Sequence, residues 1–132
     1  MMPVDMTLFG VRRYPFAPGN CLSACVASIL EMPIEEVPLF VDRHDPSVIA
    51  QDAGLLWASR LNKWLARFGL QAKFFEPGDP EIAPDYHILY GYSVLGNEHA
   101  VVGHAGRVIH DPHPSRTGLA RVTGVICIAP AS

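Results

Sequence analysis

The sequence of 132 residues has few charged side chains and no excess of positive charge. Asp, Glu, Lys and Arg make up 17% of it, against about 25% in a typical soluble domain. The formal net charge is −3. A general nucleic-acid-binding protein usually has a basic face, so this balance argues against a nucleic-acid partner. The hydrophobic share of 49% is too high for a disordered chain.

Long hydrophobic runs and a large set of cysteines are also missing. No run approaches the ~20 apolar residues that a membrane-spanning helix needs. Charged residues interrupt the N-terminal segment before the core of a signal peptide could form. Cys21, Cys25 and Cys127 are an odd number of cysteines, which favours a reducing compartment over a disulfide framework. We therefore expect a cytoplasmic protein with no membrane partner.

Proline, in contrast, is plentiful. The 12 prolines among 132 residues are nearly twice the usual share of about 5%. Together with 11 glycines they predict many rigid turns. The length suits one domain, over residues 1–132, with a core of its own.

Two segments have the pattern of helices. CLSACVASILEM, residues 21–32, is small and apolar on nearly every side, which predicts a buried helix. Asn20 is in the position of its N-terminal cap, and Pro33 ends it. The second helix is expected at about 52–68, where an apolar stripe of Leu, Trp and Phe ends at Gly69.

After the second helix the hydrophobic period changes to two. This change predicts strands at 70–76, 86–94, 99–105, 107–111 and 121–129. The Ala105-Gly106 pair predicts a tight hairpin between the third and fourth of these strands. Helices followed by antiparallel strands indicate an α+β fold, with the first helix packed on a C-terminal antiparallel sheet.

Cys21 is a candidate nucleophile because it is the first residue of the expected buried helix. The unpaired N–H groups and the positive end of the helix dipole at this position stabilise a thiolate. The same N–H groups can bind the negative oxygen that forms when a thiolate attacks a carbonyl carbon. Cys25 and Cys127 fall in apolar segments, and we expect them to be buried structural residues.

His99 and Asp111 are candidates for a base and its orienting group. A two-residue turn at 105–106 is expected to place Val102 opposite Ile109. Continued along the strands, this register brings Asp111 to within one position of His99. A carboxylate there would hold one tautomer of the imidazole and stabilise the imidazolium.

The segments GNCLSACVASIL and HAVVGHAGRVIHDPHP resemble the papain-like cysteine peptidase superfamily. They are similar to bacteriocin-leader-processing peptidases and to small bacterial and phage papain-like proteins. The resemblance implies a papain-like domain that acts without a cofactor on a peptide or protein substrate. It implies that Cys21 is the nucleophile, His99 the general base and acid, and Asp111 the orienting group. It also implies that helix and sheet meet so that Cys21 lies beside His99.

One position departs from the family pattern. Such peptidases usually carry a Gln six residues before the Cys to help bind the oxyanion, and Pro15 stands there in this sequence. The Asn20 side chain or a backbone N–H is the substitute that we expect.

Three functions remain open at this point. The first is a thiol hydrolase that cleaves a peptide, isopeptide or amide bond through an acyl-enzyme. The second is a thiol acyltransferase or deamidase with the same triad. The third is a non-catalytic papain-like module that binds a peptide, which the missing Gln favours and the presence of Cys, His and Asp opposes.

Two other residue sets invite different interpretations. His104, His110 and His113 suggest a metal site, but their spacing around a proline-rich turn does not ensure that they converge, and we expect no metal. Arg116 is a candidate for binding a substrate carboxylate. The substrate itself and the oligomeric state are not indicated by any motif.

Overall fold

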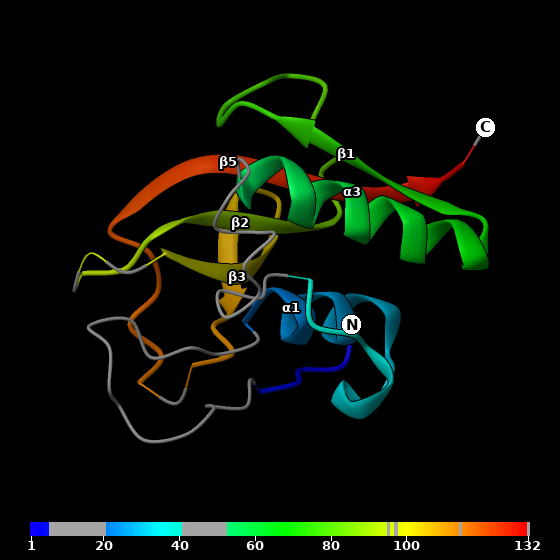
Figure 1. The fold of residues 1–132 in the computed structure, drawn as a ribbon. Coiled ribbons are helices and arrows are strands. Elements are labelled where there is room, and N and C mark those ends of the chain that lie inside the picture. Colours follow the sequence, from blue (N-terminus) through cyan, green and yellow to red (C-terminus); the bar gives the residue numbers. More distant parts are fainter. Residues whose placement is uncertain (6–20, 41–52, 95, 97, 114, 132) are drawn as a thin grey trace.

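A single antiparallel sheet forms the centre of the protein, in a computed structural model that describes residues 1–5, 21–40, 53–94, 96, 98–113 and 115–131 (Figure 1). Within these residues the sheet has five strands in the order β1-β5-β2-β3-β4. The strands are β1 (Leu70–Phe75), β2 (Tyr86–Tyr92), β3 (Glu98–His104), β4 (Arg107–His110) and β5 (Arg121–Pro130). The helices are α1 (Cys21–Leu30) and α3 (Ala53–Leu65), with short 3-10 turns η1 (Ile34–Glu36) and η2 (Ala66–Phe68). The predicted α+β class, with antiparallel strands after the helices, is confirmed.

Helix α1 is buried, as its composition predicts. Every residue from Leu22 to Ser28 is buried, which fits a helix that is apolar on nearly all sides. The helix ends at Leu30, two residues before the expected end. Glu31 takes a left-handed conformation with φ of 57°, and the Met32 N–H donates to the Ala27 carbonyl at 3.0 Å. This pair of features is a common helix C-terminal cap, so the cap ends the helix before Pro33 is reached.

Helix α3 occupies most of the second expected helical segment. Its last turn tightens into η2, and Gly69 ends it with a left-handed φ of 71°. Leu61 and Leu65 are fully buried, but Phe68 is 47% exposed. Its ring packs against that of Trp64, with the centroids 4.9 Å apart. Of the helices in the described part of the chain, none is long and apolar enough to cross a membrane.

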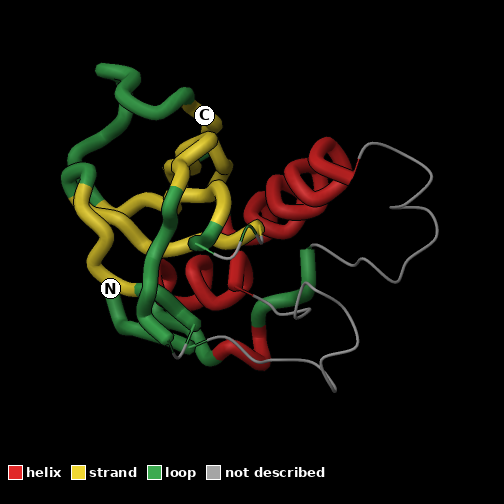
Figure 2. The backbone as a smooth tube through the Cα atoms, turned by 90° about the vertical axis from the view of Figure 1, so that its left-hand side faces the viewer, coloured by secondary structure: helices red, strands yellow, loops and turns green. Residues whose placement is uncertain are grey.

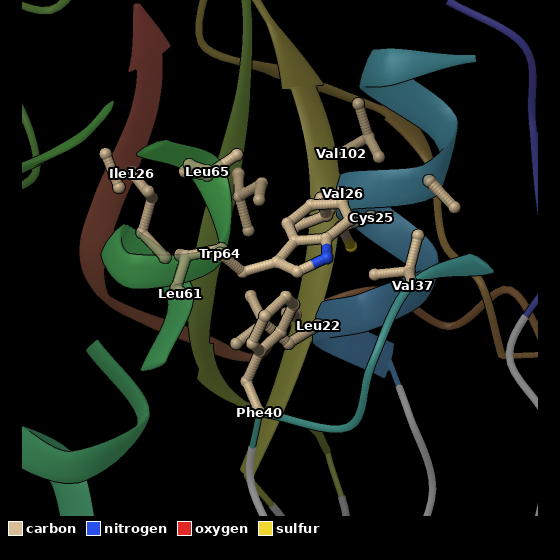
Figure 3. Packing of buried hydrophobic residues seen from close by; sticks show 14 residues of the cluster. Leu22, Cys25, Val26, Val37, Phe40, Leu61, Trp64, Leu65, Val102 and Ile126 are labelled. Atoms are coloured by element: carbon tan, nitrogen blue, oxygen red, sulfur yellow. The ribbon is translucent and has the colours of Figure 1, made fainter. Parts of the chain in front are cut away.

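The main core lies between the helices and one face of the sheet (Figure 3). Helix α1 packs beside β3, and α3 packs beside β1. In Figure 2 the strands gather on one side of the molecule and the helices on the other. The cluster contains Val26 from α1, Leu61 from α3, and Ile88, Val102 and Ile126 from the sheet. Along the strands, the side chains of this cluster alternate with those of a second cluster on the other sheet face. The second cluster is made of Leu89, Val101, Val125 and Cys127.

The β3–β4 hairpin forms at the predicted turn, but its register is different from the predicted one. Ala105 and Gly106 both have positive φ, 51° and 80°, as a type I′ turn requires. Beyond the turn Val102 pairs with His110, because the register shifts by one residue. The prediction that Val102 lies opposite Ile109 is therefore wrong. A β-bulge inserts Ile109 as an extra residue, and regular alternation of side chains does not predict such an insertion.

Candidate functional site

Cys21 is the first residue of α1, and its side chain is half-buried. The N–H groups of the first helical turn have no partner within the helix. No acidic residue lies in that turn, so no negative side chain there opposes a thiolate. The start of α1 thus offers a partly accessible sulfur beside backbone N–H groups that have no partner within the helix.

His99 lies in β3, and its ring interacts with the first residue of α1. Its Nε2–H donates to Asp111 Oδ1 at 2.6 Å, and its ring also interacts with the Cys21 thiol. An imidazole has two ring nitrogens, so Nδ1 is the one left for the thiol. Burial by itself lowers the pKa of His99, but its interactions with Cys21 and Asp111 outweigh burial and raise the pKa above the ordinary value.

Asp111 follows β4 directly, and its carboxylate is buried and fully hydrogen-bonded. Besides the bond from His99, Oδ1 accepts the His113 N–H at 2.9 Å and Oδ2 accepts the Gly118 N–H at 2.7 Å. Burial by itself raises the pKa of this carboxyl, but the three hydrogen bonds outweigh burial and lower it. The group is therefore ionised at neutral pH and oriented toward His99.

Thiol, imidazole and carboxylate thus form a chain of interacting groups, with a hydrogen bond between His99 and Asp111. In such a chain the imidazole can accept the thiol proton on one nitrogen while the carboxylate stabilises the positive charge through the other. The bulge at Ile109 does not prevent this arrangement, because Asp111 lies beyond the paired part of β4. The turn after the strand, rather than the strand register, sets the position of the carboxylate.

That turn contains residues that the sequence did not single out as part of the site. The backbone N–H groups of His113 and Gly118 hold the Asp111 carboxylate. The His113 ring lies edge-on to the His99 ring, with 6.2 Å between the centroids. Gly118 has a φ of 74°, in the region that favours glycine. A proline- and glycine-rich segment directly after an Asp was the only signal in the sequence for this turn.

Arg116 does not present a free guanidinium to a substrate carboxylate. It binds the Asp5 carboxylate through both terminal nitrogens, at 2.6 and 2.9 Å, and donates to the main-chain carbonyl of Asp111. The prediction that Arg116 binds a substrate carboxylate receives no support from this pairing. Asp5 belongs to the N-terminal segment, so the contact links that segment to the turn after β4.

The other residues considered in the sequence are not part of this group of interacting side chains. Asn20 and Pro15 lie outside the described residues, and the expected oxyanion role of Asn20 stays a prediction. Cys25 and Cys127 are buried, and burial raises the pKa of each thiol. In the described part of the chain no three His, Cys, Asp or Glu side chains are grouped to hold a metal ion.

The three clustered histidines have different partners. His110 Nε2–H donates to the Val4 carbonyl at 2.9 Å. His113 Nδ1 is hydrogen-bonded to Ser115, and the His104 ring lies against that of Tyr86. They do not converge on one point.

Comparison with known proteins finds no family model, no curated protein and no solved structure that matches this chain.

Proposed function

We propose that the protein is a thiol hydrolase with a papain-like fold, which cleaves a peptide, isopeptide or amide bond through an acyl-enzyme on Cys21. One observation carries the proposal: the His99 ring interacts with the Cys21 thiol at a helix start and is hydrogen-bonded to the buried carboxylate of Asp111. A thiol nucleophile needs an adjacent base, and that base needs a third group to orient it. His99 and Asp111 are the residues that we assign to these two roles.

The first half of the reaction forms the acyl-enzyme. His99 Nδ1 accepts the proton of the Cys21 thiol, and the thiolate attacks the carbonyl carbon of the substrate. The electron pair of the carbonyl π bond moves to the oxygen, which accepts hydrogen bonds from backbone N–H groups at the start of α1. The C–N bond then breaks, and His99 Nδ1–H donates its proton to the leaving amine.

The second half releases the acid. A water molecule gives one proton to His99 Nδ1 and attacks the thioester carbon. The C–S bond breaks, the sulfur takes the proton back from His99, and the free thiol is restored. Throughout both halves Asp111 keeps the Nε2–H of His99 hydrogen-bonded, so that Nδ1 always faces the sulfur.

Site-resolved alkylation tests the activated thiol directly. The protein is treated with iodoacetamide at several pH values, and the modification of each cysteine is followed by peptide mass spectrometry. We expect Cys21 to react at least tenfold faster at pH 6 than the same cysteine in the urea-unfolded chain, because His99 can accept the thiol proton as the sulfur attacks the reagent. His99→Gln should lower the rate of Cys21 alkylation about a hundredfold.

The internal controls are Cys25 and Cys127, which are buried in the same molecule. Both should remain unmodified until the protein unfolds. The proposal is wrong if native Cys21 reacts no faster than in the unfolded chain and His99→Gln leaves that rate unchanged.

The fate of the acyl group identifies the reaction. Peptides with amide, isopeptide and glutamine side-chain bonds are supplied with and without an added amine, and the products are weighed. Release of the free acid supports hydrolysis. Preferential capture by the amine would assign acyl transfer, and release of ammonia would assign deamidation. A protein with a reactive Cys21 that turns over none of these bonds, but binds one of the peptides, would instead be a binding module.

A further inference from the structure

Hydrogen bonds hold the backbone of Asp111 as well as its carboxylate. Its main-chain carbonyl accepts a hydrogen bond from the Arg116 guanidinium. The same guanidinium binds both carboxylate oxygens of Asp5, at 2.6 and 2.9 Å. Two-point pairing of this kind fixes the orientation of a guanidinium far better than a single contact does.

The backbone conformation of the turn places the Arg116 side chain beside Asp5 and the Asp111 carbonyl. Arg116 has a φ of 54°, a left-handed conformation that is uncommon for a residue with a Cβ. Its N–H donates to the His113 carbonyl at 3.0 Å, which closes the turn. An uncommon backbone conformation persists only where the surrounding contacts support it, and the bonds of the Arg116 N–H and of its side chain are such contacts.

The N-terminal segment that carries Asp5 is itself anchored to the rest of the protein. The Val4 N–H donates to the Ser28 hydroxyl of α1 at 2.9 Å. The Val4 carbonyl accepts a hydrogen bond from His110 at 2.9 Å. Asp5 is therefore a brace with a defined position, even though its side chain is half exposed.

We propose that Arg116 is a positioning residue for Asp111, which it holds through the main-chain carbonyl while Asp5 braces its guanidinium. This inference rests on the proposed function, because it assigns support for the third group of the same site. Arg116 touches neither the thiol nor the imidazole in the described contacts, so its effect on them passes through Asp111. Loss of the contact lets the turn relax and lengthens the bond between Asp111 and His99.

A direct charge effect of Arg116 on His99 would have the opposite sign. Removing a nearby positive charge favours the protonated imidazole and raises its pKa. Losing the hydrogen bond that His99 donates to an ionised Asp111 disfavours the protonated imidazole and lowers its pKa. The direction of the change in the pKa of His99 therefore distinguishes positioning from a through-space charge effect.

The experiment measures the pKa of the His99 ring by NMR titration in a Cys21→Ala background, with and without Arg116→Gln. The alanine removes the effect of the thiol on the ring, so the contribution of Asp111 to the pKa of His99 is easier to follow. Among the described residues, the titratable and charged groups around Asp111 and its turn include His99, Cys25, His113, Arg116, Asp5 and His110. We expect Arg116→Gln to lower the pKa of His99, and Asp5→Asn to lower it by less.

Two further variants serve as controls. Arg107→Gln removes the same charge from an exposed position on β4 and should not lower the pKa of His99. Arg116→Lys keeps the charge without the planar fork, so an intermediate value is expected. The site borders an open depression of about 570 Å³, lined in part by Asp5, His110 and Arg116. These substitutions therefore do not enter the core, and circular dichroism verifies the fold of each variant.

The same substitutions in the chain that retains Cys21 give an independent reading. A displaced catalytic group costs a large factor in rate, and we expect Arg116→Gln to slow alkylation of Cys21 by about tenfold. An unchanged or raised pKa of His99 in folded Arg116→Gln would overturn the positioning role and leave the proposed function intact. Slow alkylation of Cys21 in the parent chain would instead count against the proposed function, whatever the ring titration shows.

Discussion

The Asp111→Asn substitution keeps the size of the side chain but replaces one acceptor oxygen with an NH2 donor. Oδ1 accepts bonds from His99 and the His113 N–H, and Oδ2 accepts one from the Gly118 N–H. In either orientation of the amide, the new NH2 group faces at least one N–H donor. At least one buried donor is therefore left unpaired, and the bonds that remain lose the contribution of the negative charge.

The size of the effect follows from these contacts. A hydrogen bond to a charged group contributes about 1.5–3 kcal/mol, and an unpaired buried donor costs about 1–3 kcal/mol. Because these effects overlap, we expect the free energy of unfolding at pH 7 to fall by about 2–4 kcal/mol. For a chain of 132 residues this corresponds to a decrease in Tm of roughly 10 °C.

The loss should depend on pH in a defined direction. Burial raises the pKa of Asp111, but its hydrogen bonds outweigh burial and hold the pKa below the ordinary value of 3.8. The stability that the carboxylate contributes is therefore fully present above pH 3.8 and is lost as the pH falls through the lowered pKa. The difference in the free energy of unfolding between the parent protein and Asp111→Asn should therefore become smaller as the pH falls below 3.8.

Urea unfolding at pH 7 and at pH 3, followed by tryptophan fluorescence, measures this difference. Asp85→Asn is a matched control, because Asp85 is exposed and accepts a single bond from the Tyr86 N–H at 2.8 Å. It should change stability by less than about 0.5 kcal/mol. Equal stability of Asp111→Asn and the parent at pH 7, or a difference that stays constant down to pH 3, would refute the reasoning.

Three other substitutions or reactions probe the scaffold around the site. Gly91→Ala would place a Cβ 1.9 Å from the Arg121 carbonyl oxygen, so β2 and β5 must separate; we expect a loss of about 2 kcal/mol or more in urea unfolding, and an unchanged midpoint would contradict the close approach. Ser28→Ala removes the hydroxyl that accepts the Val4 N–H and should cost about 1–2 kcal/mol by the same assay; no loss would mean that this bond contributes nothing. The Cys25 thiol is fully buried and its pKa is raised, so a disulfide reagent should modify it only as fast as the protein unfolds, and rapid modification of the native protein would show that it is accessible.

Local signals in the sequence account for most of the elements. The small apolar residues after position 20 predict a helix that is buried on all sides, and Leu22 to Ser28 are buried. The period of two after Gly69 predicts the strands, and Ala105-Gly106 predicts the type I′ turn. The end of α1 at Leu30 and the tightening of η2 were not predicted, because they depend on cap geometry that many sequences can adopt.

The candidate site shows a sharper division between local and tertiary information. Cys21, His99 and Asp111 were singled out from residue type and position, but spacing alone does not place a helix start beside a strand. The bulge at Ile109 shifts the register on which the expected contact depended. The contact instead forms through the turn after β4, whose backbone N–H groups orient the Asp111 carboxylate.

By itself the sequence determined the α+β class, the buried first helix, the hairpin turn, and the residue types of a thiol, an imidazole and a carboxylate. Each of these depends on residues close together in the chain, or on composition. Only the tertiary structure decided that Arg116 meets Asp5, which lies 111 residues away in the sequence. No local pattern encodes such a contact, because it forms only when the sheet, α1 and the N-terminal segment have packed together.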